Sequence, residues 1–474
     1  MKPQLKIATN GGKQENDEAE PVSPTGQYFN SKVLSICIIA VLETEVPVNE
    51  SCVMPQLRDV FLPLNPRFSS VMASDKKDVK QWKRVEVNLQ DHVVVPSFPD
   101  GLSVESYTDY FDEYLTKITG DQLPQDRPLW ELHIFKYPTS KAANHIIFKL
   151  HHSLGDGYSL MGALLSCLQR ADNPSLPITF PSTQTTKKIK NNNAMEFINW
   201  MPRIMSSIYK GACDFGWSFL KSTCKADDKT PIRSENKGLG FNQIKISTIE
   251  LPLDQIKQIK TKLGSTVNDT VAGIIFLGVR RYMQETDIES SNSQSTALVL
   301  LNTRNVGGYM SVEEMEKTHS WGNQFAFLHI MMPELINDKN SNILDFIYKA
   351  HNQIMRLRNS PAVYLTAQCL ELIRKCRGPE AVAELVHSTL NKSSMAITNM
   401  IGPVEQVTLA DHQIKGMYFM VVGSPQSLVI TIMSYAQTLR IGIGAEKGFI
   451  DSQRLNSCIK NAFNLVSEAA TKTG

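Results

Sequence analysis

The chain of 474 residues lacks a long hydrophobic run, a paired-cysteine motif and a large excess of charge of one sign. The apolar run VLSICIIAVL, residues 33–42, is shorter than the roughly 20 residues of a membrane-spanning helix, and its β-branched residues favour a buried strand. The formal net charge of +2 gives no reason to expect nucleic-acid binding. Eight cysteines are scattered singly, without Cys-x-x-Cys spacing, so we expect reduced thiols.

Other familiar signals are also missing. Residues 1–20 are polar and of mixed charge, without the apolar stretch of a signal peptide, and we expect them to be disordered. The sequence has no repeat of solenoid period and no glycine loop of the dinucleotide-binding or P-loop type. These absences exclude a repeat architecture and a nucleotide-dependent site of those two types.

What is present is an alternation of strand-like and helix-like segments in two regions, residues 21–175 and 237–474. This pattern predicts two α/β halves joined by a connector. The expected strands are 33–43, 82–88, 129–137, 145–152, 247–252, 296–305, 322–332, 395–403, 416–423 and 427–445. The expected helices are 106–120, 157–171, 253–264, 267–285, 342–360, 362–376 and 452–472.

The connector is expected at residues 176–236. It opens with the polar, basic tract TTKKIKNNN, and residues 195–222 then carry large apolar side chains at roughly helical intervals. Trp200, Phe215 and Trp217 are of the type that anchors an amphipathic helix in a membrane surface, and charged residues interrupt the apolar run. The alternative is a helix that packs on the protein's own core.

The stretch HHSLGDG, from His151 to Gly157, lies between a predicted strand and a predicted helix. An imidazole has an ordinary pKa of about 6.5, so His152 could accept the proton of a hydroxyl group, whose oxygen would then attack an acyl carbonyl. Asp156 could hold the loop by pairing with an arginine or by capping the helix. Gly157 could permit a sharp turn.

Two other interpretations of the histidine pair stay open on residue types alone. The pair could lie at the surface, or in the core with its hydrogen bonds satisfied. A metal site is the weaker alternative, because adjacent side chains on a strand point to opposite faces and no third ligand is near in the sequence.

HHSLGDG resembles the HHxxxDG signature of coenzyme-A-dependent acyltransferases and of peptide-synthetase condensation domains. Four further stretches resemble motifs of the plant bifunctional wax ester synthase/diacylglycerol acyltransferase family. They are, in order, EPVSPTGQYF from residue 20, RPLWELHIF from residue 127, STVNDTVAGII from residue 265 and AITNMIGP from residue 396. The chain is thus similar to this family from about Glu20 to its end.

The resemblance implies an α/β fold of two chloramphenicol-acetyltransferase-like domains, whose mixed sheets face each other across a substrate tunnel. It implies an O-acyltransferase that moves a long-chain fatty acyl group from acyl-CoA to a long-chain fatty alcohol, giving a wax ester, or to diacylglycerol, giving triacylglycerol. Acyl-CoA is then a co-substrate, and we expect no bound cofactor, no metal and no nucleic acid.

The resemblance also implies roles for residues of the motif. His152 is the general base, and Asp156 is its structural partner. Gly157 and the secondary His151 complete the catalytic candidates. Trp130, a large apolar side chain, is expected to pack the domain instead of binding substrate.

Three further residues become candidates for lining the tunnel. Asn399 falls in a predicted turn after a strand. Asn268 and Asp269 follow Thr266 at the start of a predicted helix, where capping is the alternative role.

A soluble acyltransferase for small specialised metabolites and a non-catalytic acyl-binding scaffold are the rival functions. If the protein is the lipid acyltransferase that the resemblance implies, we expect it on a membrane lipid surface, at the cytosolic face of the endoplasmic reticulum and also at the plasma membrane. Both lipid substrates dissolve there.

Overall fold

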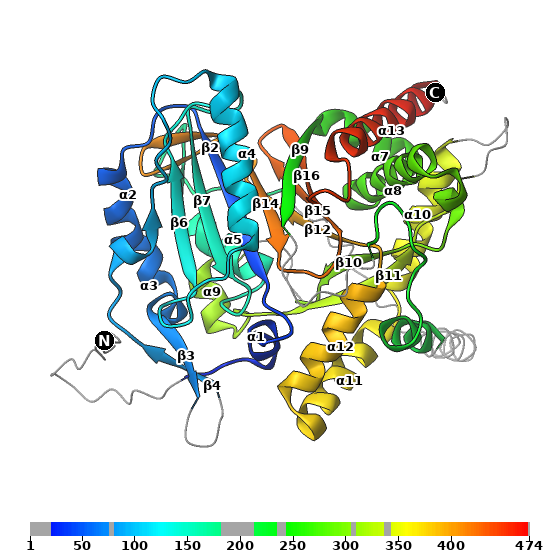
Figure 1. Ribbon diagram of the computed structural model, residues 1–474, viewed down its shortest axis with the longest axis horizontal. Coiled ribbons are helices and arrows are strands. Elements are labelled where there is room, and N and C mark those ends of the chain that lie inside the picture. Colours follow the sequence, from blue (N-terminus) through cyan, green and yellow to red (C-terminus); the bar gives the residue numbers. More distant parts are fainter. Residues whose placement is uncertain are drawn as a thin grey trace, which may run out of the picture.

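The fold is that of a computed structural model (Figure 1), in which residues 20–74, 80–181, 213–234, 243–304, 310–335 and 343–472 are described. Two large sheets lie side by side, and helices cover each of them. The predicted α/β fold of two domains with mixed sheets is confirmed. The N-terminal tail up to residue 19 and connector residues 182–212, with Trp200, lie outside the described residues.

The first sheet has seven strands and is antiparallel except where β5 pairs with β6. All eight residues of β2 and all eight of β7 are buried, which is why these segments read as continuous apolar runs. In spatial order, the strands are β5 (Val93–Val94), β6 (Trp130–Phe135), β7 (Asn144–His151), β2 (Cys37–Thr44), β14 (His412–Val422), β13 (Val407–Leu409) and β8 (Leu168–Arg170).

The second sheet has six strands and mixes both pairings, since β12 runs parallel to β10 and to β15 while the other pairs are antiparallel. In spatial order, the strands are β11 (Phe325–Met331), β10 (Thr296–Asn302), β12 (Met395–Ile401), β15 (Leu428–Tyr435), β16 (Thr438–Glu446) and β9 (Ile244–Pro252). A small third sheet consists of β1 (Glu20–Pro21), β4 (Lys80–Arg84) and β3 (Ser70–Ser74).

Helices of the first half include α1 (Pro24–Phe29), α2 (Glu50–Gln56), α3 (Leu62–Leu64), α4 (Val104–Gly120) and α5 (Gly157–Ser166). Those of the second half include α7 (Leu253–Leu263), α8 (Val267–Thr286), α9 (Val312–Lys317), α10 (Ile343–Arg358), α11 (Ala362–Arg377), α12 (Pro379–Lys392) and α13 (Ser452–Lys472). Helices α8, α10 and α13 pack on one another beside the second sheet (Figure 1). Residues 213–223 of the connector are helical as well.

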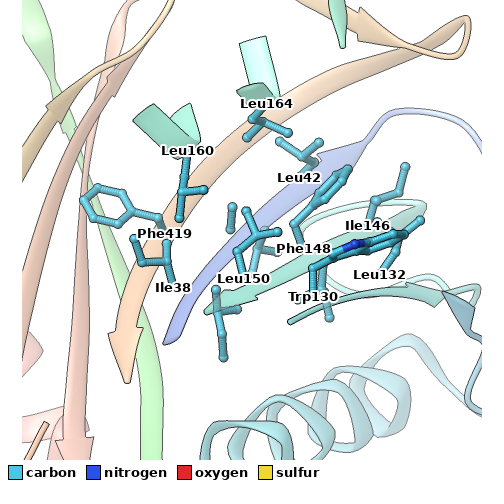
Figure 2. Close-up of a cluster of buried hydrophobic side chains, with 14 of the residues drawn as sticks. Ile38, Leu42, Trp130, Leu132, Ile146, Phe148, Leu150, Leu160, Leu164 and Phe419 are labelled. Atoms are coloured by element: carbon cyan, nitrogen blue, oxygen red, sulfur yellow. The ribbon is translucent and has the colours of Figure 1, made fainter. Parts of the chain in front are cut away.

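The hydrophobic core between helix α5 and the first sheet packs against strand β7, which ends at His151. Figure 2 shows Leu160 and Leu164 of α5 above the apolar side chains of β2 and β7, among them Ile38 and Phe148. Trp130 is fully buried, and its indole N–H donates to the carbonyl of Phe68 at 2.9 Å. This contact confirms the packing role predicted for Trp130.

The C-terminal half contributes two strands to the first sheet, so chain order and sheet membership differ. Strands β13 and β14 come from the segment predicted as the C-terminal domain, 237–474, yet they pair with β8 and β2 of the first sheet. The buried Arg440 of β16 crosses to the first sheet and pairs with Glu43 of β2 at 2.7 Å. These strands and this ion pair hold the two sheets against each other.

Local boundaries differ from the predictions at several places. The strand expected over 427–445 is two strands, β15 and β16, which pair across a turn at residues 436–437. The strand expected over 82–88 is β4, which ends at Arg84.

The helix expected over 157–171 ends at Ser166, because residues 168–170 pair with β13 as strand β8. Ser103, three residues before Ser106, caps helix α4. Helix α12 was not predicted.

Candidate active site

His152 is the first residue after strand β7, so the strand determines where it lies. Its backbone N–H donates to the carbonyl of Ile36 at 2.8 Å. The residue is 4% exposed, and its ring packs against those of Phe29 and Phe325, with centroids 4.6 and 5.6 Å away. Because Phe29 belongs to α1 and Phe325 to β11, both halves of the chain enclose the imidazole.

The imidazole of His152 has one polar side-chain partner from the other half. Its Nδ1 lies 2.8 Å from Oδ1 of Asn323, and Nδ2 of Asn323 donates to the His152 carbonyl at 2.9 Å. Burial lowers the pKa of His152 below its ordinary value, while the Asp156 carboxylate and the Asn323 hydrogen bond oppose that shift. The ring is therefore neutral at pH 7 and able to accept a proton.

His151 has a different environment, as the alternation of side chains along a strand requires. Its Nε2 lies 3.1 Å from Oγ of Ser35 and its Nδ1 lies 2.8 Å from Oγ of Ser153. Burial and the neighbouring His152 lower the pKa of His151 to about 3. His151 does not line the cavity described below, so its contacts indicate a structural part in the turn.

Asp156 holds the loop in both of the ways predicted from its residue type. One carboxylate oxygen accepts the backbone N–H of Ser159 at 3.0 Å, which caps α5. The other pairs with the buried Arg304 at 2.7 Å and accepts the backbone N–H of Gln324 at 2.9 Å. A buried pair with several hydrogen bonds fixes the loop between His152 and α5.

Sequence reasoning missed Arg304 and Asn323, which lie 148 and 171 residues along the chain from Asp156 and His152. Arg304 fell near the end of the predicted strand 296–305, and Asn323 fell at the start of the predicted strand 322–332. In the structure both lie just outside strands, since β10 ends at Asn302 and β11 begins at Phe325. Neither position in the sequence indicates a partner so far away.

Gly157 is required for a reason other than the predicted one. Its backbone does not adopt the left-handed region that favours glycine. A Cβ at this position would instead lie 2.8 Å from Sδ of Met400 on β12. Glycine here therefore lets the N-terminus of α5 approach the second sheet closely.

A cavity of about 300 Å³ lies between the two sheets with His152 and Asp156 in its wall. Apolar side chains from both halves form most of it, including Ile38, Met161 and Phe419 from the first sheet and its helix. From the second sheet come Leu300, Phe325 and Met400, among others. An apolar space with a few polar groups suits a lipid chain attached to a reactive polar group.

The three tunnel candidates separate in the structure. Asn399 lies within strand β12 and not in the predicted turn. Asn399 and Asn268 both line the cavity, and Nδ2 of Asn399 donates to Oδ1 of Asn268. Asp269 does not line it. Its carboxylate is buried and pairs with His351 and Arg358 of α10, at 2.9 and 3.0 Å, which anchors α8.

Within the described ranges, no group of three or more His, Cys, Asp or Glu side chains is placed to bind a metal ion. In the same part of the chain, no helix combines the length and the apolar character needed to cross a bilayer.

Two family models match the chain. The model for the wax ester synthase/diacylglycerol acyltransferase catalytic domain matches residues 33–271, and the WS/DGAT C-terminal domain matches residues 321–467. The match to the catalytic-domain model defines an acyltransferase. The chain belongs to the wax ester synthase/diacylglycerol acyltransferase family, as its motifs predicted.

Relatives and solved structures agree with this assignment. Wax ester synthase/diacylglycerol acyltransferases 4 and 11 of Arabidopsis thaliana are each 26% identical to this chain over 97% of its length, and the alignments cover 92% and 97% of those proteins. The Marinobacter aquaeolei wax ester synthase/diacylglycerol acyltransferase has the same fold, with a TM-score of 0.61 at 14% identity, covering 95% of this chain and 100% of that one. The starter condensation domain of rhizomide synthetase, solved in complex with C8-CoA, has a TM-score of 0.53 at 10% identity, with 96% and 95% coverage.

Proposed function

We propose that this protein transfers a long-chain fatty acyl group from acyl-CoA to a long-chain alcohol, giving a wax ester, and to diacylglycerol, giving triacylglycerol. The observation that supports this most is the neutral, buried His152 in the wall of an apolar cavity between the two sheets. The names of its Arabidopsis relatives include both activities, and the related condensation domain was solved with C8-CoA bound. Acyl-CoA would therefore be the donor.

In the proposed reaction His152 acts as general base. It removes the proton of the acceptor hydroxyl as the oxygen attacks the thioester carbonyl, forming the new C–O bond. The carbon–sulfur bond then breaks, and the thiolate of coenzyme A takes up the proton held by the imidazolium. The Asp156–Arg304 pair keeps the loop rigid, and burial in one cavity brings both substrates together.

The amides of Asn268 and Asn399 are the proposed polar contacts for substrate. They occupy the second-sheet side of the cavity that also includes His152. A primary amide can donate to a carbonyl oxygen or accept from a hydroxyl, so either substrate's polar end could be oriented there.

An acceptor panel with purified protein tests the proposed function. Labelled palmitoyl-CoA is supplied with hexadecanol in one reaction and with diacylglycerol in another, a labelled short-chain acyl-CoA is supplied with a small phenolic alcohol in a third, and ester products are separated and counted. Wax ester or triacylglycerol is the expected result. Turnover of short acyl donors on small phenolic alcohols alone would support the metabolite acyltransferase, and acyl-CoA binding without any ester would support the scaffold.

We also propose that the connector docks the enzyme on the cytosolic face of the endoplasmic reticulum and also on the plasma membrane. In the described end of the connector, Phe219 and Leu220 are 44% and 41% exposed. The ammonium group of the exposed Lys225 lies over the Trp217 ring, whereas Lys221 is buried and pairs with Asp227. Exposed apolar side chains beside a cation suit an anionic lipid surface.

Vesicle flotation tests this docking. Serine replacing Phe219 and Leu220 together should reduce the fraction that floats with anionic vesicles. Leu102→Ser, which removes a similarly exposed leucine (37%) from the other half, is the matched control and should float as the parent does. Unchanged flotation of the double variant would contradict a docking role for this segment.

A further inference from the structure

We infer that Asn323 is a positioning residue that fixes His152 as the tautomer with its proton on Nδ1, so that Nε2 is the basic nitrogen. This inference rests on the proposed function, because it names the atom that takes the substrate's proton. It adds a residue of the C-terminal half to the machinery around the motif.

The assignment follows from what each group is able to donate. The carbonyl of His152 only accepts hydrogen bonds, so the group of Asn323 that lies 2.9 Å from it must be the amide nitrogen. The amide oxygen then faces Nδ1 of His152 at 2.8 Å. Since that oxygen only accepts, Nδ1 must carry the proton, and in a neutral ring Nε2 is then unprotonated.

The free nitrogen is placed for chemistry. In the described part of the chain, Nε2 of His152 has no hydrogen-bond partner, and the residue lines the cavity that would hold the substrates. A lone pair on Nε2 would therefore be available to an acceptor hydroxyl. The other tautomer would present an N–H there and could not accept the proton.

The neighbouring histidine is held in the opposite state. The backbone N–H of Ser153 donates to Nδ1 of His151 at 3.1 Å, so this nitrogen is unprotonated. Nε2 of His151 then carries the proton and donates to Oγ of Ser35. Two adjacent imidazoles thus have different tautomers because their partners differ, which indicates that Asn323 is a specific determinant for His152.

The backbone around Asn323 is held tightly enough to set a side-chain geometry. The indole N–H of Trp321 donates to the carbonyl of Leu154 at 3.0 Å. The carbonyl of Gly322 accepts from Nη2 of Arg304 at 2.6 Å and from Oγ of Ser159 at 3.1 Å. Gly322 has a φ of +114°, which favours glycine. The consecutive residues 321–323 therefore all hydrogen-bond to the loop that carries His152 or to the helix that follows it.

Nitrogen-15 NMR of histidine-labelled protein, with His152→Gln to assign the ring signals, measures the tautomer directly. The parent should show a protonated Nδ1 and an unprotonated Nε2 for His152. Asn323→Ala should give a mixture of both forms. It should also lower kcat by about 10- to 100-fold, less than the ~10⁴-fold loss seen when a catalytic histidine is held in the wrong tautomer.

The pH dependence of kcat/KM gives a second readout that a purely structural role would not move. The Asn323 oxygen favours the protonated ring, so Asn323→Ala should shift the acidic limb to lower pH. Asn323→Asp, which adds a negative charge, should shift it to higher pH. Asn359→Ala, at an exposed asparagine between α10 and α11, is the matched control and should change neither tautomer nor limb.

The two claims fail in different ways. If Asn323→Ala lowers turnover while the tautomer and the acidic limb stay as in the parent, the positioning role is wrong. A parent spectrum with the proton on Nε2 would also overturn it. If the parent makes no ester, the proposed function fails, whereas the tautomer measurement needs no turnover and still tests Asn323.

Discussion

The loop that carries His152 and the segments that hold that loop come from opposite halves of the chain. The N-terminal half supplies the proposed base, Asp156 and the end of strand β7. The C-terminal half supplies Arg304, Asn323 and the β12 wall of the cavity, and its residues make most of the polar contacts to the loop. One half therefore carries the proposed chemistry, and the other determines its geometry.

This division explains why the two halves need a firm connection. Strand β14 of the later segment pairs along the whole of β2, and Arg440 reaches Glu43 from the second sheet. A shift between the sheets would break the contacts to Asp156 and to His152 at once. Substitutions that remove side-chain groups from each half test whether one half carries the chemistry and the other determines its geometry.

Removal of the proposed base should have the largest effect. His152→Ala is expected to lower kcat by roughly 10²–10⁴-fold, the usual contribution of a positioned base. Ester formation at saturating substrate, together with thermal unfolding, measures this change. His151→Ala is the contrast within the same half and should lower stability while much of the turnover remains. An equal loss of turnover in both variants, with both folded, would contradict the distinction.

Loss of the ion pair that Arg304 of the C-terminal half makes with Asp156 should have the second largest effect. Arg304→Met leaves the Asp156 carboxylate buried without its cation, and the free energy of unfolding should fall by about 3–5 kcal/mol. Denaturant unfolding measures it. Lys317→Met, which breaks an exposed pair with Glu313, is the control and should change stability little. If both variants were equally stable, the buried pair would not hold the loop.

For each buried histidine, acidic pH should weaken the fold by a smaller step than the loss of Arg304 does. Burial lowers the pKa of His145 and His151 to about 3 and that of His329 to about 4, below the value of about 6.5 in an unfolded chain. The contribution of these neutral histidines to folding stability is fully present above about pH 6.5. It is lost as the pH falls, because the unfolded chain then binds protons at these histidines and the folded chain does not.

For each of these histidines, the free energy of unfolding should fall by about 1.4 kcal/mol for every pH unit below about 6.5. Unfolding by urea at pH 7 and at pH 5 checks the prediction. His145→Gln should flatten the slope by about one proton. A fold equally stable at both pH values would mean that these rings are not buried in the neutral form.

The smallest effect is expected at the contact between Gly157 and Met400. Gly157→Ala places a methyl group against the flexible end of the methionine, which should lower the free energy of unfolding by about 1 kcal/mol, measured by denaturant unfolding. The additional change Met400→Ala should recover much of this loss. Gly216→Ala, where a Cβ meets nothing within 4 Å, is the control. A double variant no better than the single one would contradict the steric explanation.

Much of the local structure could be predicted from the sequence. The β-branched runs gave β2 and β7 correctly, and the strand–loop–helix around HHSLGDG placed His152 at a strand end and Asp156 at a helix cap. These features depend on neighbouring residues. Helix α12 was not predicted, although it carries a local signal, because Pro379 follows Gly378 and Val382, Val386 and Leu390 recur at helical spacing.

The partners across the site could not be predicted in the same way. Arg304, Asn323 and Met400 meet the motif only because two sheets come together, and no local pattern encodes that meeting. The same holds for β8, which continues a helical pattern in the sequence but pairs with β13 when folded. Asp269 shows the converse, since its motif suggested the tunnel and its contacts place it against α10.

The most direct test of the central claim follows thiol release and ester formation together, in the parent protein and in His152→Ala, with palmitoyl-CoA and hexadecanol. The account predicts equal amounts of coenzyme A and wax ester from the parent, and a folded variant that forms neither above a low residual rate. Thiol release without ester, or undiminished ester formation by the folded variant, would contradict it.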